Sequence, residues 1–149
     1  MPPEGKGPRA QGSERASFST SRSHLFSAFL ARFAEPKATL RKLFSRLTFN
    51  VLSGNTDDHA RNHAAFWDGA ELTLTPTYDV CPLPRTGGEA SQAIAIGRDG
   101  YRLSQVAACV VRGSTYLLTE EEAREIVDRH RLWVGAFFNP HATEGYSGG

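Results

Sequence analysis

Apolar residues recur with helical spacing early in the chain and predict its first long element. Positions i, i+3, i+4, i+7 and i+11 are filled by Leu40, Leu43, Phe44, Leu47 and Val51. This spacing puts them on one face of a helix, whose other face carries Arg41, Lys42, Ser45 and Arg46. Pro36 suits a first helical turn, and Gly54-Asn55 favours a left-handed end. We therefore expect a helix from Pro36 to Gly54 with one buried face.

Helical spacing returns in the last third of the chain. Thr119 and Glu122 have the spacing of a capping box, which indicates a helix start. The apolar stripe that follows is Ile126, Val127, His130, Val134 and Phe137, and Asn139-Pro140 closes the helix. A shorter helix, capped by Ser104 and ended by Gly113, is expected before it.

Between the helical segments the pattern changes to short strand-like runs. Residues 63–67 and 71–75 flank Asp68-Gly69, a strong hairpin signal, and Pro76 ends the second run. Residues 91–97 resemble a further short strand. Two tryptophans, Trp67 and Trp133, are expected in the core.

The ends of the chain lack the apolar residues that a core requires. Residues 1–24 are rich in Gly, Ser, Pro, Arg and Gln and are expected to be disordered, as is the polar tail 141–149. Residues 25–33 form an amphipathic run that predicts a short helix. The expected organisation is one domain over residues 25–140, mainly α with a small β-hairpin.

Composition narrows the function classes. The chain has 149 residues, with 17 Lys and Arg against 16 Asp and Glu, so bulk charge does not favour direct nucleic-acid binding. It has neither a secretory signal nor an apolar stretch of about 18 residues, so a soluble cytoplasmic protein without membrane contact is expected. Cys81 and Cys109 are expected to be buried free thiols.

The candidate chemistry lies just after the first long helix. Asp57 is followed five positions later by Asn62, and Asp79 lies beyond the predicted hairpin. In phosphoryl transfer one carboxylate orients the attacking hydroxyl, while an amide oxygen and a second carboxylate hold magnesium on the nucleotide phosphates. Asp57 has the required offset to Asn62; Asp58, although adjacent, does not. The hairpin would fold Asp79 back towards the loop.

Two alternative interpretations use the same residues. Asn55, Asp57 and Asp58 could simply cap and shape a turn. His59 and His63 are four residues apart, like two zinc ligands on one helix face, which would suggest a metal-dependent phosphoester hydrolase. That reading lacks an obvious third ligand and helical continuity. We expect His59 to support the loop through hydrogen bonds and His63 to open the first strand.

At these residues the chain resembles a known family. The sequence GNTDDHARNH over residues 54–63, with LTPTYDVCP over residues 74–82, is similar to the C-terminal region of HipA-type serine/threonine kinases. These are bacterial toxin–antitoxin kinases, and the resemblance covers roughly residues 25–138. It implies a protein-kinase-like C-lobe, with Asp57 as the catalytic acid and Asn62 and Asp79 as magnesium ligands. It also implies ATP as the phosphoryl donor, a protein Ser/Thr substrate and a small DNA-binding antitoxin as partner.

The resemblance further implies an N-terminal lobe with a nucleotide-binding lysine. The three lysines here are Lys6, Lys37 and Lys42, and none is predicted on a strand. We therefore expect a C-lobe part of such a kinase, whose N-lobe would be encoded separately or absent. The alternative from another class is a non-catalytic interaction module that binds an antitoxin or a separate N-lobe.

Overall fold

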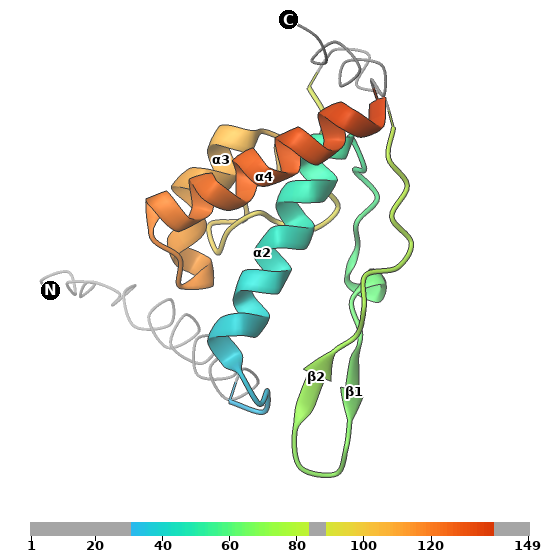
Figure 1. The fold of residues 1–149 in the computed structure, drawn as a ribbon, viewed down its shortest axis with the longest axis vertical. Coiled ribbons are helices and arrows are strands. Elements are labelled where there is room, and N and C mark those ends of the chain that lie inside the picture. Colours follow the sequence, from blue (N-terminus) through green and yellow to red (C-terminus); the bar gives the residue numbers. More distant parts are fainter. Residues whose placement is uncertain (1–30, 84–88, 139–149) are drawn as a thin grey trace, which may run out of the picture.

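The computed structural model describes residues 31–83 and 89–138 and is mainly helical, with one small sheet (Figure 1). Three α-helices run over Pro36–Ser53 (α2), Val106–Val111 (α3) and Glu120–Phe138 (α4). Two 3-10 helices cover Ala60–Asn62 (η1) and Gly113–Tyr116 (η2). Strands β1 (Ala65–Trp67) and β2 (Leu72–Leu74) form the antiparallel hairpin. The predicted helix at residues 25–33 and both terminal segments lie largely or wholly outside the described residues.

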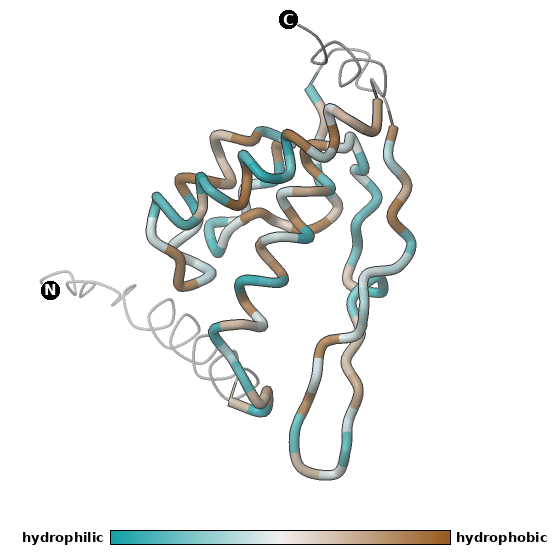
Figure 2. Tube along the Cα trace, viewed as in Figure 1, coloured by the Kyte–Doolittle hydropathy of each residue, from teal (hydrophilic) through white to brown (hydrophobic). Residues whose placement is uncertain are grey.

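Helix α2 confirms the first predicted element and forms the centre of the fold. It begins at Pro36 and ends where Gly54 takes a φ of 76°, which glycine adopts without a Cβ penalty. Helices α3 and α4 and the turn η2 pack against one side of α2, while the hairpin extends away from these helices (Figure 1). Hydrophobic and hydrophilic segments alternate along α2 and α4, as helices with one buried face require (Figure 2).

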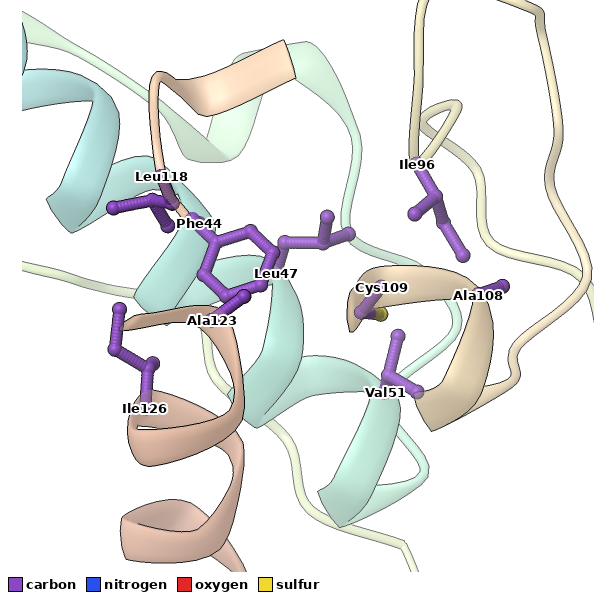
Figure 3. Packing of buried hydrophobic residues seen from close by; sticks show 9 residues of the cluster. All are labelled: Phe44, Leu47, Val51, Ile96, Ala108, Cys109, Leu118, Ala123 and Ile126. Carbon is purple, nitrogen blue, oxygen red and sulfur yellow. The ribbon is translucent and has the colours of Figure 1, made fainter. Parts of the chain in front are cut away.

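The core forms where the apolar face of α2 meets the C-terminal helices (Figure 3). Phe44 and Val51 are fully buried and Leu47 is 5% exposed, so the predicted phase of the helix is correct. The remaining members come from the later segments and are Ile96, Ala108, Cys109, Leu118, Ala123 and Ile126. Phe44 also contacts the ring of Tyr116 in η2, with centroids 5.3 Å apart.

The capping box of α4 is formed as predicted. The Glu122 main-chain N–H donates to Thr119 Oγ1 over 3.1 Å, and the Thr119 N–H donates to Glu122 Oε2 over 2.8 Å. The predicted cap of α3 is wrong, because Gln105 occupies the N-cap and makes no side-chain capping bond. Ser104 instead accepts a 2.8 Å hydrogen bond from the buried amide of Gln92.

A buried histidine links α4 to α2. His130 is 4% exposed, and its Nε2 and Nδ1 lie 3.1 Å and 2.9 Å from the hydroxyls of Ser45 and Thr48. The Thr48 hydroxyl also lies 3.0 Å from the carbonyls of Phe44 and Ser45, to which it donates its proton. His130 Nδ1–H therefore donates to Thr48, and Nε2 accepts from Ser45. Burial, with a smaller effect of the charge on Arg129, holds the pKa of His130 below its usual value.

Several expectations for individual residues are wrong. Trp67 and Trp133 are 52% and 58% exposed, because no other element of the described residues covers that side of β1 and α4 runs past the core at its C-terminal end. Cys81 is exposed, whereas Cys109 is buried as expected, and both are free thiols. Residues 91–97 form no strand: Ser91 makes a single bridge with Leu103, and the segment then turns. No helix in the described part of the chain is long and apolar enough to cross a membrane.

The core position of Leu47 can be tested against an exposed leucine. Leu47→Ala should lower the free energy of unfolding by about 2–5 kcal/mol, the usual range for a truncated core leucine. Leu132, on α4, is 74% exposed, so Leu132→Ala should change it by less than about 0.5 kcal/mol. Denaturant melts of both variants check this, and equal midpoints would contradict the packing of α2.

The neutral state of His130 predicts a pH dependence of stability. Its pKa is lowered on folding, so the unfolded chain binds the proton more readily. Stability should be complete above the unperturbed histidine pKa of about 6.5 and should fall as pH drops below it. Chemical unfolding from about one unit above to one unit below that value measures the loss. His130→Gln keeps a polar side chain without titration and should show a clearly smaller decrease; the same decrease in both proteins would contradict the assignment.

Candidate functional site

The predicted site lies at the C-terminal end of α2, where the chain turns towards the hairpin (Figure 1). The outgoing segment before β1 and the returning segment after β2 run side by side there. The Leu83 N–H donates to the Ser53 carbonyl at 2.8 Å, and the Tyr78 hydroxyl donates to the Arg61 carbonyl at 2.7 Å. Loop residues held between rigid elements are common locations for function.

The two adjacent acids of the loop have opposite environments. Asp57 is exposed, and within the described residues its carboxylate forms no hydrogen bond or ion pair. Asp58 is 4% exposed and accepts a 2.9 Å hydrogen bond from His63 Nε2. The structure therefore assigns the structural, turn-shaping role to Asp58 and leaves Asp57 available to a ligand.

Asp58 is held in its charged form. Burial is the largest influence on its pKa and acts to raise it. Hydrogen bonds from His63 and Asn50, together with the charges of His63 and His59, outweigh burial and keep the pKa of Asp58 below its usual value. The loop is thus anchored by a buried carboxylate with several partners.

Asn62 ends the 3-10 turn η1 and points back into the loop. It is 7% exposed, and its Nδ2 donates to the Asp57 carbonyl over 3.5 Å. The sequence offset between Asp57 and Asn62 therefore corresponds to a contact within one loop. With Nδ2 used in this way, the side-chain oxygen of Asn62 is the atom left to accept from a donor or a cation.

Asp79 lies on the returning segment in an unusual backbone conformation. Its φ is 55°, in the left-handed region that non-glycine residues seldom occupy. Its side chain is exposed. Aspartate tolerates this conformation better than most residues, but such outliers often occur at functional sites. The bond from Tyr78 to Arg61 ties the residue before Asp79 to the residue before Asn62.

The structure thus brings Asp57 and Asn62 into contact and ties Asp79 to them through neighbouring residues. Among the described residues, no hydrogen bond joins the Asp79 carboxylate to Asp57 or Asn62. The Asp79 carboxylate and the Asn62 amide oxygen are hard oxygen ligands of the kind that magnesium prefers, and water would complete its coordination.

The two histidines of the loop, His59 and His63, have different surroundings. His63 is bonded to Asp58, while His59 Nδ1 is buried without a hydrogen-bond partner in the described part of the chain. The expected supporting hydrogen bond of His59 is thus not seen at that atom. Within residues 31–83 and 89–138, no cluster of three or more His, Cys, Asp or Glu side chains could hold a metal ion.

Sequence reasoning missed the contribution of α2 to the loop. Arg46 was expected on the solvated face but is 9% exposed and donates to the Thr75 carbonyl. Burial lowers the pKa of Arg46, and the charges of Asp58 and Tyr78 partly offset this. Asn50, one turn later, accepts a 3.1 Å hydrogen bond from Asn55. The sequence signal for this contribution was the spacing of four residues between Arg46 and Asn50, just before the acidic loop.

Comparison with known proteins gives one finding. The family model described as HipA-like C-terminal domain matches residues 9–135, which is more than half of the chain. The match begins within the N-terminal segment that lies outside the described residues. No curated protein and no solved structure matches the chain.

Two variants test the charge of Asp79 and its left-handed backbone conformation separately. Asp79→Asn keeps a side chain that tolerates a left-handed φ and should change the free energy of unfolding by less than about 0.5 kcal/mol. Asp79→Val puts a β-branched residue there and should cost about 1–2 kcal/mol. Thermal melts of both variants measure the difference, and equal stability would mean that the left-handed conformation is not kept in solution.

Proposed function

The chain belongs to the family of HipA-like C-terminal domains, and from this premise we propose that it is the C-terminal catalytic-lobe part of a HipA-type serine/threonine kinase. The observation that supports the proposal is the difference in environment between the adjacent acids Asp57 and Asp58. Asp58 is buried and anchors the loop, while Asp57 is exposed beside Asn62. A purely structural turn has no need of a second, exposed carboxylate.

In the proposed reaction the γ-phosphoryl group of ATP passes to a serine or threonine hydroxyl of a protein. The bond between the γ-phosphorus and the bridging oxygen to the β-phosphate breaks, and a phosphorus–oxygen bond to the acceptor forms. Asp57 orients the acceptor hydroxyl and receives its proton, a role that requires an accessible and correctly aimed carboxylate.

Asn62 and Asp79 are the proposed magnesium ligands. The cation neutralises the negative charge of the nucleotide phosphates when it is bound. The protein contributes an amide oxygen fixed by η1 and a carboxylate on the returning segment. Phosphoryl transfer depends mainly on such positioning and charge stabilisation, so small shifts of either ligand should strongly reduce the rate.

The proposed partners follow from the family. We propose an N-lobe that supplies the nucleotide-binding lysine, a protein Ser/Thr substrate and an antitoxin. Whether the C-lobe acts alone or with an N-lobe is decided by measuring phosphoryl transfer with and without an added N-lobe.

A non-catalytic interaction module is the second candidate. A groove of about 390 Å³ lies between α2, α4 and the returning segment, and Phe49, Val80 and Trp133 are among its lining residues. The aromatic residues Phe66 and Trp67 of the hairpin are also exposed. Such apolar surface suits a protein partner. This candidate requires no cation response from the acidic loop.

Magnesium binding to the isolated chain distinguishes the two candidates. At a magnesium concentration equal to the dissociation constant, wild-type protein should gain about 0.4 kcal/mol of stability, and higher concentrations should give more. Asp79→Asn should abolish this gain because it removes the charged ligand. Asp57→Asn should keep most of it, because Asp57 acts on the acceptor hydroxyl, but should abolish phosphoryl transfer.

Thermal melts over a magnesium series measure these responses, with calcium and added salt as controls for charge screening. Equal responses of wild type, Asp57→Asn and Asp79→Asn would support the interaction module. They would count against an assembled phosphoryl-transfer site.

A further inference from the structure

One charged side chain of α2 is buried between the two segments that carry the proposed site. Arg46 is 9% exposed, and one guanidinium nitrogen donates to the Thr75 carbonyl at the end of β2. Its other terminal nitrogen, Nη1, has no hydrogen-bond partner within the described residues. The charge of Asp58 lies near enough to act on the guanidinium.

Stability alone does not explain such an arginine. Removing a guanidinium from water costs a large desolvation free energy. The attraction between an arginine and an aspartate seldom exceeds that cost. Replacing a buried ionic side chain by an apolar one of similar volume is often neutral or stabilising. The unpartnered Nη1 makes the penalty larger here. Its hydrogen bond to Thr75 is therefore better explained by the position that it gives to the segment returning from the hairpin.

Arg46 and Asn50 together connect the two halves of the site to α2. Asp58, whose charge acts on the Arg46 guanidinium, is the residue next to Asp57. Thr75 precedes Asp79 by four residues along the returning segment. Asn50 lies one helical turn after Arg46 and holds the start of the loop through Asn55 and Asp58. Both side chains come from one rigid helix, whose apolar face is fixed in the core.

We propose that Arg46 and Asn50 are positioning residues that set the distance between Asp57 and Asp79 by fastening both segments to α2. This inference rests on the proposed function, because it concerns the same two acids. Arg46 is hydrogen-bonded to the returning segment at Thr75, whereas Asn50 holds the outgoing loop. Neither residue touches the reactants. Outer partners of this kind typically change metal affinity or activity by about 10–100-fold.

The first test needs no metal and no activity. Arg46→Met preserves a long side chain without charge or donors, and Arg46→Lys preserves the charge but cannot make two directed bonds. Arg41→Met is the matched control, because Arg41 lies on the same helix but pairs with Glu122, away from the loop. Amide hydrogen exchange is measured on wild type and the three variants.

Arg46→Met should speed exchange at least about tenfold at the hydrogen-bonded amides of the two segments, Asn62, His63 and Leu83, while leaving the amides of α2 and α4 unchanged. Arg46→Lys should give an intermediate change, and Arg41→Met none in these two segments. Unchanged exchange in both segments of Arg46→Met would overturn the inference. A uniform rise over the whole domain would do the same, since it would show an ordinary structural role.

The second test separates this inference from the proposed function. Binding of Mn²⁺ as a magnesium substitute is followed by its paramagnetic effect on water relaxation. Wild type and Arg41→Met should bind equally, whereas the dissociation constant of Arg46→Met should rise about 10–100-fold without a fall in melting temperature.

Equal Mn²⁺ affinity of wild type and Arg46→Met would overturn the positioning role. If wild type itself bound no Mn²⁺, the proposed function would fail for this chain. The exchange measurement would then still decide whether Arg46 fastens the two segments.

Discussion

The burial of one face of α2 is the constraint on which the remaining structure depends. Phe44, Leu47 and Val51 pack into the core and fix the rotation of the helix about its axis. Once this rotation is fixed, Arg46 and Asn50 lie on a neighbouring face of the helix, along which the loop and the returning segment pass. The hydrophobic core thus determines the position of the polar site without contacting it.

In the proposed site, similar residues have different environments. Asp57 and Asp58 are adjacent acids, yet one is exposed and the other is buried with hydrogen-bond partners. Asp79 is held in a left-handed conformation that most residues avoid. A domain selected for stability alone would gain by relieving the strained backbone at Asp79. The exposed Asp57, the left-handed Asp79 and the buried Asn62 together support the proposed phosphoryl-transfer site over a purely structural turn.

Much of this arrangement is local and could be read from the sequence. The phase of α2, the capping box of Thr119 and Glu122 and the hairpin at Asp68-Gly69 all follow from residues close together in the chain. The hydrogen bond from the Asn62 amide to the Asp57 carbonyl is likewise local, because five positions separate the two residues.

What could not be predicted depends on contacts between distant segments. Nothing near Arg46 in the sequence shows that the end of β2 will cover it, and nothing near Trp133 shows that its face of α4 stays open. Residues 91–97 have the apolar alternation of a strand but find no strand to pair with beyond the single bridge at Ser91. The pairing of His130 with α2 likewise depends on how two helices meet.

The central claim is that the acidic loop and Asp79 form a site for a magnesium nucleotide. The most direct measurement is calorimetric titration of the chain with Mg-ATP, alongside Asp79→Asn, whose fold the substitution should preserve. The account predicts saturable binding by the wild-type chain, loss of that binding in Asp79→Asn, and no binding of ATP when magnesium is withheld. Binding that is equal in the two proteins, or absent from both even with an N-lobe present, would contradict it.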